Sequence, residues 1–246
     1  MQKAYFNWSS GKDSTLALYK VLQEKEYSVE QLVTAVNNDF NRVSMHGLRA
    51  SLLEEQVKSI GLPLYEIELS GDISMQTYDS RMRLETEKLL KQGFKYAIFG
   101  DIFLEDLRLY REEKLLEVGI NAVFPLWKQD TKALLLEFLS LGFKAITVCV
   151  NAKFLDESFV GREVNEQFLA DLPENVDPCG ENGEYHTFVY DGPIFKYPIL
   201  FEIGEKVKRG YEPSKDGNDC YKKKPTWDFS FWYCDLLPID TEKFKI

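Results

Sequence analysis

Histidine and cysteine are scarce in this sequence. Its 246 residues include two histidines and four cysteines, and no two cysteines form a C-x-x-C pair. A structural zinc site uses four such ligands at short, paired spacings, so the composition argues against one. The positions of Cys149, Cys179, Cys220 and Cys234 provide no disulfide framework either. A reducing compartment is therefore the simpler expectation.

Long apolar segments are absent as well. No run approaches the roughly 20 consecutive apolar residues that a membrane-spanning helix needs. Lys12 also brings a charged loop too early for a secretory signal peptide. We therefore expect a cytoplasmic protein that has no membrane partner.

Positive charge is outnumbered by negative charge. The chain has 30 Lys and Arg against 40 Asp and Glu, which gives a formal net charge of −10. A strongly acidic protein is repelled by phosphate backbones and anionic lipid, so generic nucleic-acid binding is not expected. The net charge does not exclude a local basic patch.

A short polar loop near the N-terminus carries the strongest chemical signal. The hexapeptide S-S-G-K-D-S, residues 9–14, lies between an apolar segment (4–8) and a helix-like segment (15–25). The start of a helix offers unpaired N–H groups and the positive end of its dipole, and both favour phosphate. Gly11 lets a ligand come close, and Lys12 adds a mobile positive charge.

The side chains of this loop allow other roles. Asp13 and Ser14 can cap the helix, and Ser14 can also donate to a phosphate oxygen. The loop is not a Walker A sequence, because neither G-x-x-x-x-G-K-[ST] nor G-x-G-x-x-G occurs in the chain. The alternative without function is a capped helix that carries a surface lysine.

Strand-like and helix-like segments alternate over the first two-thirds of the chain, which predicts a mostly parallel sheet with helices on both faces. In such sheets ligands bind at the carboxyl ends of the strands, so the loops after residues 8, 36, 99 and 124 should share one edge. The expected strands are 4–8, 31–38, 64–69, 96–99, 122–124 and 144–150, and the expected helices are 15–25, 47–60, 74–92, 105–118 and 131–141.

The pattern changes after about residue 152. One helix is expected at residues 161–172, followed by a polar, turn-rich stretch and strand-like runs at 184–190, 199–203 and 227–236. We interpret this as a smaller C-terminal α+β part. The predicted domains are a domain at residues 1–151 that carries the phosphate-binding loop and a second, smaller domain at 152–246.

A second informative stretch, D-P-C-G-E-N-G-E-Y-H-T-F-V, begins at Asp177. Two glycines flank Glu181 and Asn182, so the backbone can turn tightly there. Glu181 and Glu184 are close enough in sequence to converge on one centre, where they could bind a metal, hold an ammonium ion or act as a base. The alternative is a β-turn with exposed acids that leads into a strand.

Together the motifs resemble the diphthine–ammonia ligase (diphthamide synthetase) family of PP-loop, or N-type, ATP pyrophosphatases. The resemblance spans roughly residues 1–200, and Ser10 replaces the first glycine of the usual S-G-G-K-D-S form. The motifs are S-S-G-K-D-S at 9–14, G-D-I at 100–102, F-P-L-W at 124–127, G-R at 161–162, G-E-N-G-E-Y-H-T at 180–187 and D-G-P at 191–193.

The resemblance implies an adenine-nucleotide α-hydrolase-like fold and a two-step amidation. ATP would adenylate the carboxylate of diphthine, a modified histidine on translation elongation factor 2, or an analogous acceptor. Free ammonia would then displace AMP. Mg²⁺ would neutralise the leaving pyrophosphate, with Asp13 or Asp101 as its ligand.

The resemblance also assigns residues to the site. Lys12, Glu181 and Glu184 would be catalytic, and Asn182, Tyr185, His186 and His46 are candidate substrate contacts. ATP would be held by Ser9, Ser10, Gly11, Lys12, Asp13, Ser14, Gly100 and Asp101.

Several of these residues have a second interpretation. Gly100 and Asp101 could simply form a turn at the end of a strand, and His46 could cap a helix. Two other functions stay open for the whole chain: a nucleotide-binding regulatory protein without turnover, and a PP-loop ligase that acts on a different small-molecule or RNA acceptor.

Overall fold

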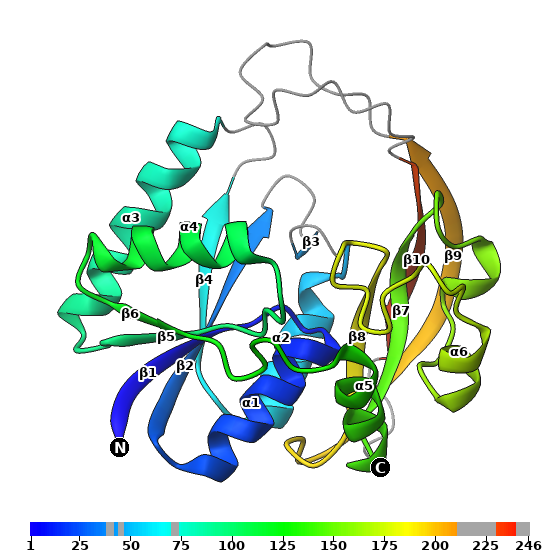
Figure 1. Cartoon of the computed structure of the whole chain (residues 1–246), viewed down its shortest axis with the longest axis horizontal. Coiled ribbons are helices and arrows are strands. Elements are labelled where there is room, and N and C mark those ends of the chain that lie inside the picture. Colours follow the sequence, from blue (N-terminus) through cyan, green and yellow to red (C-terminus); the bar gives the residue numbers. More distant parts are fainter. Residues whose placement is uncertain (38–41, 44–46, 70–73, 211–229, 240–246) are drawn as a thin grey trace.

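The computed structural model describes residues 1–37, 42–43, 47–69, 74–210 and 230–239. Two sheets stand side by side in it, the first on the left of Figure 1 and the second on the right, with helices α1 (Lys12–Glu24) and α2 (Ala50–Ile60) between them. None of the described helices is long and apolar enough to cross a membrane.

The first sheet is mostly parallel, as predicted. Strands β6 (Asn121–Val123), β5 (Tyr96–Ile98), β1 (Gln2–Asn7) and β2 (Tyr27–Asn37) lie in that order, and β4 (Leu64–Leu69) extends the sheet beyond β2. A short strand, β3 (Arg42–Val43), pairs antiparallel with the end of β2. The carboxyl ends of the five parallel strands therefore meet at one edge.

Alternating side chains of β1 divide the core into two layers. Ala4 and Phe6 join the larger cluster, which includes residues of α1, α2, α5 (Thr131–Ser140) and the second sheet. Tyr5 joins the smaller cluster, under α3 (Met75–Lys91) and α4 (Glu105–Leu116). Because successive side chains of a strand point to opposite faces, both faces of this sheet are covered.

The second sheet is antiparallel. Its order is β8 (Tyr185–Asp191), β7 (Lys144–Asn151), β10 (Ser230–Pro238) and β9 (Phe201–Gly210). A 3₁₀ turn, η1 (Glu157–Phe159), and the short helix α6 (Glu166–Asp171) lie between β7 and β8 in the chain. This is the smaller α+β part that the sequence predicted.

Residues 144–150 were expected to belong to the parallel sheet, and that expectation is wrong. Strand β7 pairs antiparallel with both β8 and β10. Its residues 145–150 are all buried, which indicates cover on both faces. Such a run does not reveal strand direction, because an antiparallel strand between two layers is equally apolar. The predicted division of the chain at residue 151 stays a prediction.

The helix expected at residues 161–172 is also shorter than predicted. Only residues 166–171 are helical, and the side chain of Asn165 caps them by accepting from Phe168 N at 2.8 Å. Before this point the backbone bonds to β7 instead: Glu163 bridges Ile146, and Val164 N donates to Ala145 O at 2.8 Å. Tertiary pairing therefore overrides the helical pattern there.

Candidate active site

The phosphate loop, residues 9–14, occupies the turn from β1 to α1. Gly11 is the N-cap residue of α1, and no side chain makes a capping hydrogen bond there. Ser14 Oγ instead donates to the carbonyl oxygen of Gly11 at 3.0 Å and accepts from Ser9 Oγ at 2.9 Å. The alternative that Asp13 or Ser14 caps the helix is therefore wrong; a side chain from another element, Thr187, accepts from Lys12 N at 3.0 Å instead.

Ser10 has an unusual backbone conformation. Its φ is +69°, in the left-handed region that glycine adopts without strain and serine avoids. The residue is fully buried, and its hydroxyl has no hydrogen-bond partner among the described residues. Ser10 thus reproduces the backbone that glycine would supply, at a cost in strain.

Gly100 owes its identity to a close approach between two elements. A Cβ atom at this position would lie 2.8 Å from Ser14 N and 2.9 Å from Ser14 Cα. Backbone atoms cannot yield that space, so only glycine lets the end of β5 contact the first turn of α1. The structure thus gives Gly100 a packing role beside the phosphate loop.

Lys12 links the phosphate loop to the acidic loop, which we define as residues 177–184. Its side chain is buried, its Nζ lies 3.0 and 2.8 Å from the two carboxylate oxygens of Asp13, and it donates to the carbonyl oxygen of Cys179. Nζ also lies 5.0 Å from the centroid of the Tyr185 ring. Burial alone would lower the pKa of Lys12, but Asp13 and its other neighbours hold that pKa above its usual value. The lysine is therefore charged.

Asp101 follows β5 at the same edge. Its Oδ1 lies 3.3 Å from a guanidinium nitrogen of Arg111, which in turn lies over the ring of Phe99. Its Oδ2 is buried without a hydrogen-bond partner among the described residues. Burial raises the pKa of Asp101, Arg111 opposes that rise, and the charge of Asp13 adds to it.

Glu181 reaches from the acidic loop to the end of β5. Its Oε1 accepts a hydrogen bond from Ile102 N at 2.7 Å. Burial raises the pKa of Glu181 to about 7; the bond from Ile102 opposes this rise, whereas the charges of Asp13 and Asp101 support it. Glu181, Asp13 and Asp101 therefore share one electrostatic environment, and Glu181 titrates near neutral pH.

Glu184 has other hydrogen-bond partners than Glu181. Its side chain is 2% exposed, and Oε1 accepts from Asp177 N at 3.2 Å and from Asn182 Nδ2 at 3.1 Å. Its Oε2 is buried and has no hydrogen-bond partner among the described residues. The two glutamates therefore have different partners: Glu181 contacts the loop after β5, and Glu184 contacts its own turn. Their convergence on one centre stays a prediction.

The candidate substrate contacts are distributed unevenly. Tyr185 is 2% exposed, and its hydroxyl donates to Pro178 O at 2.5 Å, so it forms the floor under Lys12 instead of an open substrate contact. Asn182 is exposed, and half-buried His186 lies on β8 opposite Cys149. His46 lies outside the described residues.

Three residues that the sequence analysis missed organise these loops. Asp177 Oδ1 accepts from Cys179 N at 2.9 Å and from Glu181 N at 3.1 Å, and Thr187 Oγ1 accepts from Lys12 N at 3.0 Å. The third is Gln56 on α2, which contacts Ser10 O. An Asp just before a Pro-Cys-Gly turn is a recognisable Asx signal, but no local pattern reveals the contacts that Thr187 and Gln56 make with the phosphate loop.

Within the described residues, no group of three or more His, Cys, Asp or Glu side chains could hold a metal ion by itself. Magnesium that also binds phosphate oxygens needs only one or two carboxylates. The unpartnered, buried Oδ2 of Asp101 fits that requirement. Asp13 fits less well, since Lys12 occupies both of its oxygens.

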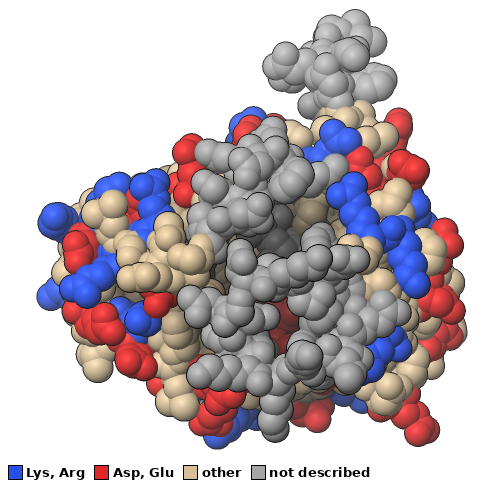
Figure 2. All heavy atoms as spheres, turned by 90° about the horizontal axis from the view of Figure 1, so that it is seen from above, with Lys and Arg blue, Asp and Glu red and all other residues tan. Residues whose placement is uncertain are grey.

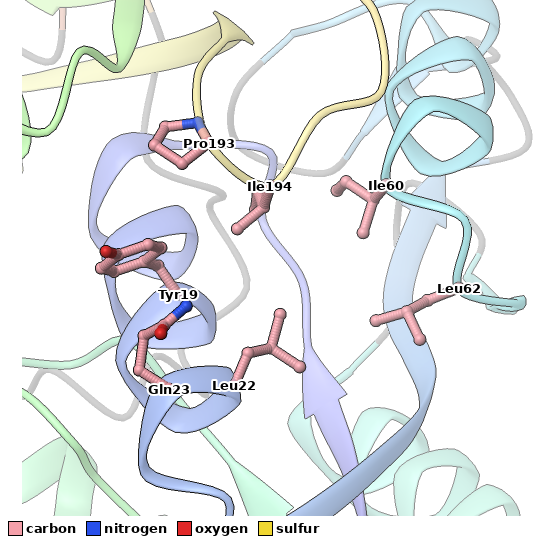
Figure 3. A pocket seen from close by; sticks show the side chains of 7 residues that line it. All are labelled: Tyr19, Leu22, Gln23, Ile60, Leu62, Pro193 and Ile194. Atoms are coloured by element: carbon pink, nitrogen blue, oxygen red, sulfur yellow. The ribbon is translucent and has the colours of Figure 1, made fainter.

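A cavity of about 450 Å³ lies away from this chemistry. It is lined mainly by apolar residues, which come from the later turns of α1, the end of α2, Leu62 and the turn after β8 (Figure 3). Lys12 is in the first turn of α1, whereas Tyr19, Leu22 and Gln23 line the cavity. Cavity size therefore does not identify the functional site here.

Charge is mixed on the face seen from above in Figure 2. Lys and Arg side chains alternate with Asp and Glu around the described part of that face. The described part of this face therefore carries both signs of charge.

Two protein-family models match this chain, one after the other. The diphthamide synthase N-terminal domain matches residues 2–122, and the diphthamide synthase C-terminal domain matches residues 130–216. A diphthine–ammonia ligase of Rattus norvegicus is 28% identical over 225 residues, which cover 81% of this chain and 82% of the relative.

Other relatives are matched over less of their length. A diphthine–ammonia ligase of Schizosaccharomyces pombe is 29% identical over 199 residues, covering 72% of this chain and 32% of that protein. The chain thus spans about a third of that relative. The solved structure of the U34-tRNA thiolase NcsA from Methanococcus maripaludis is 16% identical in sequence to this chain. The match covers 57% of this chain and 58% of the thiolase chain, with a TM-score of 0.35.

Proposed function

Because the chain belongs to the diphthamide synthase family, we propose that it is an AMP-forming ligase that converts a carboxylate to an amide. It uses ATP and free ammonia. The acceptor is diphthine, as in the names of its relatives. The protein that carries diphthine would be translation elongation factor 2, as the resemblance of the motifs implies.

One observation supports this proposal above the others. The ammonium group of Lys12, in the phosphate loop, donates to the carbonyl oxygen of Cys179, in the acidic loop. The residues suited to bind phosphate and the acids suited to handle ammonia therefore meet at one place. A phosphate site that only held a nucleotide would not need the second loop.

The first step is an adenylation. A carboxylate is a poor electrophile, and transfer of AMP to it supplies a good leaving group. The acceptor oxygen attacks the α-phosphorus, and pyrophosphate leaves. Lys12 and the backbone N–H groups at the start of α1 stabilise the charge that builds up on the leaving group.

The second step is an amidation. Ammonia attacks the acyl carbon, AMP leaves, and the nitrogen loses one proton. Glu181 is suited to accept that proton, because its pKa is raised to about 7 and it lies near the phosphate loop. Glu184, a buried acid with one unpartnered oxygen, orients the incoming nitrogen by accepting from it.

Magnesium is the metal that suits this site. Asp101 would hold it through the unpartnered Oδ2, together with oxygens of the nucleotide. The ion supplies charge neutralisation for the pyrophosphate when it is bound.

The experiment that tests the proposal is product identification. The protein is incubated with ATP, Mg²⁺ and ammonium, with and without diphthine-bearing elongation factor 2, and the nucleotides are separated. Acceptor-dependent AMP and pyrophosphate, with one acceptor carboxylate converted to an amide, is the expected result.

Other outcomes would contradict parts of the proposed function. ADP and phosphate would contradict the assignment of the loop class. AMP formation with an extract of cells that lack this protein, but none with diphthine, would indicate a different acceptor. ATP binding without turnover on either would support a regulatory nucleotide-binding protein.

A further inference from the structure

We infer that Gln56 is a positioning residue that holds the phosphate loop in its binding conformation. This inference rests on the proposed function of that loop. Gln56 lies on α2, is fully buried, and is about 45 residues away from the loop in sequence. Its hydrogen bonds among the described residues go to Trp8, Ser10 and Val189 and not to the predicted reacting groups, so its effect on the reaction passes through Ser10 and its neighbours.

The side chain of Gln56 hydrogen-bonds to three separate residues, and we call this arrangement the Gln56 junction. Its Nε2 donates to Ser10 O at 3.2 Å and to Val189 O at 2.6 Å. Its Oε1 accepts from Trp8 Nε1 at 2.8 Å. Both N–H groups and the oxygen of the side-chain amide are therefore used: they bond to Ser10 in the loop, to Val189 on β8 and to Trp8 just before the loop.

Strand β8 completes the same arrangement. Val189 N donates to Ser10 O at 3.0 Å, and Thr187 Oγ1 accepts from Lys12 N at 3.0 Å. The loop thus covers the outer edge of β8, which is the last strand of the second sheet. Gln56 lies at the point where α2, the loop and β8 meet.

The backbone conformation of Ser10 explains why the Gln56 junction is needed. It keeps φ at +69° without being glycine, and a conformation of that kind persists only where surrounding contacts hold it. Two donors, Gln56 Nε2 and Val189 N, bind its carbonyl oxygen. With Gln56 removed, a strained peptide would be held by one bond, and the N–H groups of the loop would lose their fixed direction.

The test compares Gln56→Met, which keeps the length and removes the hydrogen bonds, with Gln167→Met on the exposed face of α6. Amide hydrogen exchange of the nucleotide-free protein is measured first. We expect exchange at Lys12 and Val189 to become at least about tenfold faster in Gln56→Met, with exchange at the β9–β10 pairs unchanged. Equal rates in wild type and Gln56→Met overturn the inference, and uniformly faster exchange throughout the protein assigns Gln56 a general packing role.

ATP binding supplies the second measurement. The dissociation constant for ATP with Mg²⁺ should rise about tenfold in Gln56→Met, which corresponds to the loss of one or two hydrogen bonds. Ser10→Gly in the same chain should restore most of this affinity, because glycine takes the left-handed conformation without support. A purely structural role for Gln56 predicts no such rescue, and its absence overturns the inference.

The two hypotheses fail differently. If the wild-type protein binds no ATP, the proposed function fails, and hydrogen exchange at Lys12 and Val189 alone decides the role of Gln56. If the wild type binds ATP and Gln56→Met binds it equally well, the proposed function stands and the positioning role of Gln56 is rejected.

Discussion

The phosphate loop and the acidic loop reach one place by opposite means. Side chains of the phosphate loop bond within the loop, but the peptide groups of Ser10 and Lys12 are held by distant residues: Gln56, Thr187 and Val189. In the acidic loop the supporting bonds are mainly internal, because Asp177 accepts from two of the loop's N–H groups and Glu184 accepts from Asp177 N. Thr131 and Ile102 add bonds to its side chains from outside. A ligand-binding turn supported from outside can be tuned by remote residues, whereas a self-supported one depends on its own sequence.

The strongest test of this comparison removes the residue that joins the two loops. Lys12→Ala should lower ATP turnover by about 10³-fold and abolish measurable ATP binding, since it deletes the positive charge that faces the phosphates. Turnover and calorimetric binding are the measurements. Lys20→Ala is the matched control: it also lies on α1 and pairs with a carboxylate, Glu137, at 2.7 Å. Wild-type affinity in Lys12→Ala would remove Lys12 from the site.

The acidic loop is tested separately through Glu184. Glu184→Gln keeps the size of the side chain and should lower amide formation by about 10²-fold while ATP affinity is unchanged. The physical reason is that the variant loses the acceptor oxygen that is left unpartnered in the structure. Glu157→Gln, on an exposed turn, is the control. Unchanged amide formation would show that Glu184 only maintains its turn.

The raised pKa of Glu181, in the acidic loop, should make the stability of the protein depend on pH. Its folded pKa of about 7 lies above the ordinary value of 4.5, so between these pH values the folded state binds more protons than the unfolded state. The free energy of unfolding should therefore fall as pH rises from about 4.5 to 7, and Glu181→Gln should reduce this fall. The difference above pH 7 should be about 1–2 kcal/mol after allowance for partial exposure.

Urea unfolding at a series of pH values measures this effect. Glu105→Gln, in the exposed first turn of α4, should leave the pH dependence as it is in the wild type. A Glu181→Gln profile that runs parallel to the wild-type profile would contradict the raised pKa. Such a result would place Glu181 in water instead of beside Asp13 and Asp101.

The smallest effect is expected at Ser10. Ser10→Gly should stabilise the protein by about 1 kcal/mol, because it relieves the left-handed backbone and removes a buried hydroxyl without a described partner. Ser10→Ala removes only the hydroxyl and should recover less. Thermal unfolding of both variants measures the difference. Equal stability of the two variants would mean that the backbone at this position carries no strain.

Local pattern predicted most of the first sheet and the position of the phosphate loop. Strands and helices there alternate with clear polar breaks, and side-chain periodicity reports burial directly. The same reasoning failed at β7 and at residues 161–165, where burial was evident but the pairing partner was not. Strand direction depends on segments far away in the chain, which periodicity does not encode.

The candidate site divides in the same way. Local sequence is enough to predict that residues 9–14 form a strand-to-helix turn with a lysine and that the acidic loop turns at two glycines, because backbone conformation is a local property. Three features are visible only in the folded chain: Lys12 bonds to Cys179, Glu181 and Glu184 have different partners, and Gln56 and β8 hold Ser10. Those outcomes depend on hydrogen bonds between residues that are far apart in sequence, and only packing of the two sheets brings them together.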